Sequence, residues 1–236
     1  LPIEVWLLIL ERLRGWNMGQ SALTLAAGPN DGISKVGLIG TVSSSKMART
    51  PAGLVFPLLA CHVTLTKAAG GERHVGTKAA VYLTAVMEYL AAEHLELSGN
   101  AARKDGVEAI TLQHLEHAIE NDAELKVLAC HAQPSFSVDF TEGIQTVLRQ
   151  VHQDLKISPG ALNMLNGCVL NGLLAALICE AVVIEDDLQR STFADAWREN
   201  NEDSTRIDAR SVQLAVRSIL APGGGYDMAA AAATSA

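Results

Sequence analysis

Apolar side chains recur at helical spacing over the most strongly patterned stretch of the chain, residues 74–128. Between Lys78 and Arg103 the sequence contains no proline and a single glycine, Gly99. Apolar residues return here at intervals of three, four and seven positions, as Leu83, Val86, Leu90 and Leu97. This period is typical of a helix with one buried face, which at about 1.5 Å per residue would be roughly 40 Å long.

Shorter amphipathic segments flank this long helix on both sides. Residues 58–67 precede it, and residues 112–120 follow it behind Thr111, a residue type that commonly caps helices. A helix of this length cannot bury its apolar face by itself in a small domain, so the short segments are expected to pack across it. The pattern predicts a short, a long and a short helix within residues 51–130.

The same plan recurs in residues 141–222. A short amphipathic helix is expected over residues 141–153, and Ser158 is placed to cap a long apolar helix that runs to about Asp187. Asp208 is placed to cap a third, short helix that follows it. Two copies of one helical plan with different sequences indicate a duplicated architecture and an all-α fold.

The remaining stretches predict the domain boundaries. Residues 1–16 have an amphipathic pattern with Pro2 in the expected first turn, and residues 17–50 are rich in Gly, Ser, Thr and Ala, which predicts a flexible linker. Residues 131–140 are expected to form a connector, and residues 223–236 a disordered tail. The sequence has no pattern typical of a cleavable signal peptide.

The opening segment also resembles the beginning of an F-box, a module that docks onto a ubiquitin-ligase adaptor. The similarity rests on the spacing of Leu1, Pro2, Glu4, Ile9 and Leu13 and covers only the start of that module. A plain packing helix, a remnant of an imperfect gene prediction and a docking element are all open.

The charge of the chain is acidic, with 18 Lys and Arg residues against 26 Asp and Glu residues and a formal net charge of -8. The excess of acid lies in residues 49–130 and 131–236, and no basic tail exists. A protein that neutralises DNA phosphates is expected to be strongly basic, so this composition argues against tight binding of nucleic acid. With 49% hydrophobic residues the chain is nevertheless typical of a folded protein.

Candidate chemistry is sparse. The cysteines Cys61, Cys130, Cys168 and Cys179 show no spacing typical of a metal site, so they are interpreted as ordinary thiols in a reducing compartment. No nucleophile, base and orienting group share a motif, and no phosphate-binding loop is found. We therefore expect no enzymatic activity, no cofactor and no metal. His114 and His117 are interpreted as packing or surface residues.

Residues 52–128 resemble core histone 2A. The matching runs are AGLVFP, ERHVG, AVYL, EYLAAE, LELSGNAAR and HLEHAIENDAEL, in the order and spacing of that family. A chance similarity between two long helices would not reproduce both intervening loops. The resemblance implies a histone fold in residues 51–130.

The second copy resembles core histone 2B. The matching runs include TVLRQVHQD, the segment that begins with Ile157-Ser158, and the segment from Ser204-Thr205 to the helix VQLAVR. This copy departs from the family by a polar insertion at about residues 188–202 and by the loss of the final helix. The chain therefore resembles a histone 2A and a histone 2B fused head to tail, as some large DNA viruses and a few other lineages encode.

The resemblance implies that the two folds pair as a handshake, in which the two long helices cross antiparallel and bury their apolar stripes. Fusion would raise the local concentration of each partner for the other to about millimolar. The expected pairing core consists of Leu83, Val86, Leu90, Leu97, Leu162, Leu165, Val169, Leu173 and Leu177.

Few of the phosphate contacts of the family are kept. Its arginines on the first short helix and the second loop fall on Ala60, Val63, Thr66 and Ala109, and a basic pair falls on Glu202-Asp203. The candidates that remain are Arg49, Arg73, Arg103, Lys104, Ser204 and Thr205. We expect weak binding of duplex DNA through its backbone only, and ordinary surface charge is the alternative.

The acidic patch of the family, which takes up arginine side chains of chromatin factors, is better kept. The matching positions are Glu88, Glu93, Glu96, Asp122 and Glu124. One position of the patch becomes Ala123. Such a face could bind Arg-bearing peptides, and a solvated helix face is the alternative.

Residues 157–179 carry no charge and are long enough to suggest a transmembrane helix. Several Gly, Asn and Pro residues and the histone resemblance argue against a membrane. The outward positions of this helix are unusually apolar, at Asn171, Leu174, Ala175 and Cys179. We hypothesise that residues 188–202 or the N-terminal helix cover them.

The function implied is that of a structural chromatin protein, a fused histone dimer that joins histone 3 and 4 type partners in a nucleosome-like particle. Its location would be the nucleus and chromosome, or a viral factory or virion if the chain is viral. The alternative is a histone-fold module that has lost DNA binding and serves protein partners, as an adaptor, chaperone or decoy. The extended segment by which histone 2A docks on histones 3 and 4 is missing.

Overall fold

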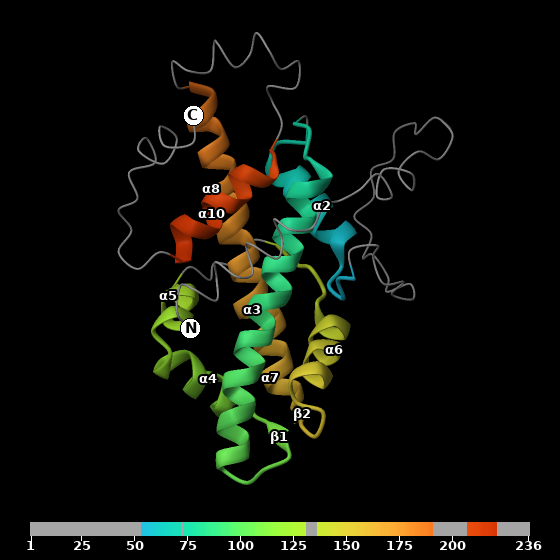
Figure 1. Cartoon of the computed structure of the whole chain (residues 1–236), viewed down its shortest axis with the longest axis vertical. Coiled ribbons are helices and arrows are strands. Elements are labelled where there is room, and N and C mark those ends of the chain that lie inside the picture. The colour runs from blue at the N-terminus through green and yellow to red at the C-terminus, as the bar shows by residue number, and fades with distance from the viewer. Residues whose placement is uncertain (1–52, 72, 131–135, 191–206, 221–236) are drawn as a thin grey trace, which may run out of the picture. The chain divides into compact units, whose positions relative to one another are not determined.

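Almost all regular structure in the described part of the chain is helical (Figure 1). The computed structural model describes residues 53–71, 73–130, 136–190 and 207–220. The helix expected over residues 1–16, the linker, the tail and nearly all of the insertion lie outside these residues. The prediction of a mainly helical protein is confirmed, although two short strands accompany the helices.

The first half forms the predicted short, long and short helices. They are α2 (Leu58–Ala68), α3 (Thr77–Lys104) and α4 (Leu112–Asn121). Thr111 begins α4 by donating its backbone N–H to Nδ1 of His114 at 3.1 Å. A further helix, α5 (Ala123–Cys130), was not predicted. Asp122 caps it by accepting the backbone N–H of Leu125 at 2.9 Å.

The second half repeats this order. It contains α6 (Thr141–Val151), a long helix built from α7 (Pro159–Asn163), η2 (Met164–Leu170) and α8 (Asn171–Arg190), and then α10 (Ala209–Leu220). Both predicted caps are confirmed. Ser158 Oγ accepts the N–H of Ala161 at 3.3 Å, and Asp208 Oδ1 accepts the N–H groups of Arg210 and Ser211 at 2.8 and 3.1 Å.

The widened π-helical turn η2 interrupts the second long helix where two asparagines hold the segment before α6. Asn171 accepts the N–H of Val138 at 2.7 Å and donates to the Val138 carbonyl at 2.9 Å. Asn166 accepts the N–H of Phe140 at 3.0 Å. These side chains satisfy backbone groups that would otherwise be buried without partners, because the segment belongs to no sheet.

The two halves exchange backbone hydrogen bonds at their loops. Strand β1 (Ala109–Ile110) of the first half pairs in parallel with β2 (Lys156–Ile157) of the second. At a second place Val75 forms a parallel bridge with Ile207. Each pairing therefore joins a loop of one half to a loop of the other, so the second loop of each half meets the first loop of its counterpart.

The two long helices run in opposite directions in Figure 1, and α3 packs against η2 and α8 as well as against α6 and α10. Most of the residues expected at their crossing are buried, namely Leu83, Val86, Leu90, Leu165, Val169, Leu173 and Leu177. Leu97 and Leu162 are only half-buried.

The side of the second long helix that was expected to face solvent is mostly buried. Asn171, Leu174 and Ala175 are buried, and only Cys179 is exposed. Leu174 and Ile178 are both 0% exposed, in a helix that packs against α10, α2, α5 and α3. These elements cover this side of the helix within the described part of the chain. Cover by residues 191–202 or by the N-terminal helix lies outside the described residues.

By length and composition this helix, from Pro159 to Leu188, could cross a membrane, with a mean hydropathy of 2.2 over its best window. In the structure 61% of that window is buried against the rest of the chain. A buried core helix has the same composition, so the apolar run is accounted for by packing.

Gly99 on α3 provides room for His152, the residue that ends α6. The imidazole is 3% exposed, and Nε2 donates to the carbonyl oxygen of Glu96 at 3.2 Å. A Cβ atom at Gly99 would lie 2.1 Å from that nitrogen. A glycine in mid-helix is normally unfavourable, and here the close approach of the second half requires it.

We expect Gly99→Ala to lower the free energy of unfolding by about 1–3 kcal/mol, because the methyl group displaces a buried ring. Gly160→Ala is the matched control, since no atom lies within 4 Å of the place its methyl group would take. That change should leave the protein equally stable or more stable by up to about 1 kcal/mol. Urea unfolding of the full chain measures both, and equal effects would contradict the packing described.

Candidate nucleic-acid and protein interfaces

Two of the predicted DNA-contacting arginines lie beside the loop pairings and are both engaged by aspartates of the second half. Arg73 precedes the Val75–Ile207 bridge, and its Nη1 lies 2.6 Å from Oδ1 of Asp186 on α8. Arg103 ends α3, and its Nη2 donates to Oδ1 of Asp154 at 2.5 Å. Their charge is therefore partly neutralised inside the protein.

The surroundings of these two pairs differ. The side chains of Arg73 and Asp186 are 29% and 28% exposed, and the Nη1 atom of Arg73 is buried. The side chains of Arg103 and Asp154 are 48% and 63% exposed. The hydrogen bond from Arg103 lowers the pKa of Asp154.

Of the other residues predicted to contact DNA, only Lys104 lies in the part of the chain that the structure describes. Lys104 is exposed at the end of α3. Arg49, Ser204 and Thr205 lie outside the described residues. Of the positions on α2 where the resemblance would place arginines, Val63 is 41% exposed, and Leu59 on the same helix is 70% exposed.

The predicted acidic patch is divided in the structure. Oε2 of Glu88 accepts the backbone N–H groups of Val55 and Phe56 at 2.7 and 3.1 Å. Partial burial raises the pKa of Glu88, while these two hydrogen bonds lower it. Glu88 therefore holds the segment that enters α2.

Glu93, Glu96 and Asp122 form the remaining acidic cluster. Partial burial raises the pKa of Glu93, and repulsion from Glu96 and Asp122 adds to the rise. The hydroxyl of Tyr89 donates to Glu93 at 3.3 Å. The side chain of Glu124 is outside the described part of the structure. The cluster thus concentrates negative charge on one face of α3.

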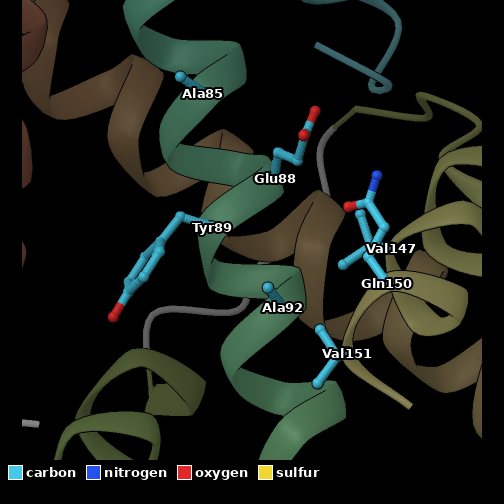
Figure 2. A pocket seen from close by; sticks show the side chains of 7 residues that line it. All are labelled: Ala85, Glu88, Tyr89, Ala92, Val147, Gln150 and Val151. Atoms are coloured by element: carbon cyan, nitrogen blue, oxygen red, sulfur yellow. The ribbon is translucent and has the colours of Figure 1, made fainter. Parts of the chain in front are cut away.

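A pocket of about 210 Å³ lies between α3 and α6 (Figure 2). Its lining consists of Ala85, Glu88, Tyr89, Ala92, Val147, Gln150 and Val151. Figure 2 shows Glu88 directed toward the α6 side and Tyr89 directed the other way. The pocket is mostly apolar and has a carboxylate at its edge. Among the described residues no group of three or more His, Cys, Asp or Glu side chains could hold a metal ion.

A comparison with models of protein families finds no match. Among curated proteins, the chain is 44% identical over 133 residues to histone 2A.2 of Scheffersomyces stipitis, across 55% of this chain and 93% of that protein. It is 54% identical over 86 residues to histone 2A.Z of Eremothecium gossypii, across 36% of this chain and 63% of that protein. The chain belongs to the histone 2A family.

Among solved structures, the histone from Methanopyrus kandleri matches with a TM-score of 0.49 and 13% identity, over 72% of this chain and 99% of that one. The alignments to the two yeast histones account for about half of the chain or less. Membership of the histone 2A family supports a structural role in chromatin.

The sequence did not point to Asp154 and Asp186, the two aspartates that form ion pairs with Arg103 and Arg73. Asp154 follows α6 within the run VHQD, and Asp186 stands in the acidic run Glu185–Asp187 at the end of α8. The loop order of two paired folds could have indicated them, because it brings the first loop of one half beside the second loop of the other.

His94 was also missed. Its Nδ1 donates to the Leu90 carbonyl at 2.6 Å, and burial lowers its pKa.

Glu93→Gln is expected to stabilise the chain at neutral pH. The pKa of Glu93 is higher in the folded state than in the unfolded state. The native state therefore loses stability as the pH rises above the pKa of the unfolded state, and the full loss is reached above the pKa of the folded state. The variant should gain about 0.2–0.5 kcal/mol at pH 7 and none below about pH 4. Thermal unfolding at both pH values tests this, with exposed Glu108→Gln as the control. An equal gain at acidic pH would contradict it.

Proposed function

We propose that the chain is a fused pair of core histones that packages DNA as part of a nucleosome-like particle. Residues 51–130 would form the histone 2A-type fold and residues 141–222 the histone 2B-type fold. The observation that carries the proposal is the reciprocal loop pairing, Ala109 with Lys156 and Val75 with Ile207. A single fold followed by an unrelated domain has no reason to exchange both loops in this order.

The packing of the long helices supports a handshake between the two folds. The apolar stripe of α3 meets η2 and α8, and seven of the nine residues expected at this crossing are buried. The two first helices are also linked at their entry, where the rings of Phe56 and Phe140 lie 4.9 Å apart. Burial of both stripes within one chain would let the fusion act as a ready-made dimer.

The DNA contacts in this proposal are few and limited to the phosphate backbone. Arg73, Arg103 and Lys104 lie at or near the paired loops, where they could approach adjacent phosphates. Arg49, Ser204 and Thr205 would add to them. The particle would be completed by histone 3 and 4 type partners, and its place would be the chromosome in the nucleus.

Reconstitution with a histone 3 and 4 tetramer on duplex DNA tests this function. We expect a defined particle that protects DNA from nuclease, and weak binding by the chain alone, with a log–log salt slope of magnitude below about 3 because few phosphates are contacted. An ordinary histone 2A–2B pair is the positive control. Failure to form a particle under conditions in which the control succeeds would contradict the proposal.

A second candidate is a histone-fold interaction module that has lost DNA binding. It is favoured by the aspartates that engage Arg73 and Arg103 and by the apolar surface of α2. This candidate requires no measurable affinity for duplex DNA at physiological salt, with or without partner histones. Titration of DNA over a range of salt concentrations therefore separates the two functions.

In either case we propose that Glu93, Glu96 and Asp122 take up an arginine of a protein partner, with apolar side chains of the partner entering the neighbouring pocket. A guanidinium can donate charge-assisted hydrogen bonds to two carboxylates at once. Repulsion among the carboxylates would be relieved on binding, and this relief favours a cationic ligand. Glu88 and Glu124 would lie at the edges of this surface.

An Arg-bearing peptide from a chromatin factor is expected to bind the full chain, and Glu93→Gln with Glu96→Gln should weaken it by at least about tenfold, since a bond to a charged group is worth about 1.5–3 kcal/mol. Glu108→Gln is the control with the same change of side chain. Fluorescence anisotropy measures the dissociation constants. A control variant that loses as much affinity would show that only net charge matters.

A further inference from the structure

We infer that Asp186, and to a lesser degree Asp154, limits the affinity of the chain for duplex DNA by occupying an arginine that would otherwise bind phosphate. The inference rests on the proposed function and deepens it, because it names the residues that set the strength of the DNA contact. Both aspartates come from the second half of the chain, and both arginines come from the first.

The pair at the Val75–Ile207 bridge is the more closed of the two. Arg73 lies one residue before His74, whose carbonyl oxygen accepts the N–H of Ile207 at 2.9 Å, so the arginine is fixed beside the loop pairing. Its Nη1 is buried and 2.6 Å from Asp186. A phosphate could engage that nitrogen only after the carboxylate moved aside.

The pair at the other end of the molecule is more open. Arg103 and Asp154 are about half exposed and well exposed, respectively, and Asp154 follows α6 just before β2. A guanidinium has five N–H donors, so Arg103 can keep its bond to Asp154 and still offer others to a phosphate. Asp154 therefore reduces the net charge at this loop pair without closing it.

The two ion pairs share one arrangement, an arginine from the first half and an aspartate from the second beside each of the two loop pairings. A carboxylate and a phosphate compete for the same planar guanidinium group. The carboxylate belongs to the same chain, so it stays beside the arginine whether or not DNA is present. It also repels an approaching phosphate. Replacing the carboxylate by an amide of the same shape should remove both effects.

Asp186→Asn is the decisive variant in the full chain. We expect it to bind duplex DNA about five- to tenfold more tightly at low salt, with the magnitude of the log–log salt slope larger by about one because one more phosphate is contacted. Asp154→Asn should tighten binding only about two- to threefold. Fluorescence anisotropy of a labelled duplex over roughly 50–200 mM salt measures both quantities.

Two controls identify the cause. Glu120→Gln removes one negative charge from an exposed position that has no ion pair with a described residue, and it should change the slope by much less than one. Arg73→Gln in the Asp186→Asn background should return the affinity to that of the control. Circular dichroism of each variant establishes that the fold is retained.

The inference is overturned if Asp186→Asn binds no better than Glu120→Gln, or if its gain persists without Arg73. If the unsubstituted chain binds DNA and Asp186→Asn behaves identically, the inference fails and the proposed DNA packaging stands. If no protein in the series binds DNA even at low salt, both fail. Binding by Asp186→Asn alone supports the inference and assigns the unsubstituted chain to the second candidate function.

Discussion

The crossing of α3 with the helix formed by α7, η2 and α8 is the contact on which the remaining structure depends. Each long helix carries an apolar stripe that its own short helices cover only in part, and each stripe loses contact with water where the other helix lies across it. At about 25 cal/mol per Å² of apolar surface, this burial contributes favourably to the folding of both halves. It also sets the relative position of the loops, so the parallel pairings β1–β2 and Val75–Ile207 follow from it.

Buried polar groups then determine how the chain enters each short helix. Glu88 holds the backbone of Val55 and Phe56 before α2, while Asn166 and Asn171 hold Val138 and Phe140 before α6. A carboxylate does in one half what two amides do in the other. These entry segments form no sheet, and without such side chains their buried N–H groups would each cost about 1–3 kcal/mol.

The electrostatic character of the chain is best understood from where its charges lie. Its net charge of -8 argues against a strong attraction to DNA, and two arginines that could contact phosphate are engaged by aspartates. The face of α3 that carries Glu93 and Glu96 remains acidic and suits a cationic protein partner better than a nucleic acid.

The sequence alone determined the local features. The bounds of α2, α3, α4 and α6 agree with the periodic pattern to within about two residues, and Ser158 and Asp208 cap the predicted helices, because caps and helical periods depend on residues a few positions apart. Tertiary structure alone decided the long-range pairings: Arg103 and Asp154 are 51 positions apart, and Glu88 lies 33 positions from Val55. The same holds for the burial of Leu174 and for the space that Gly99 leaves for His152. Both depend on which helices pack around these residues, and the residue pattern within one helix does not specify its neighbours.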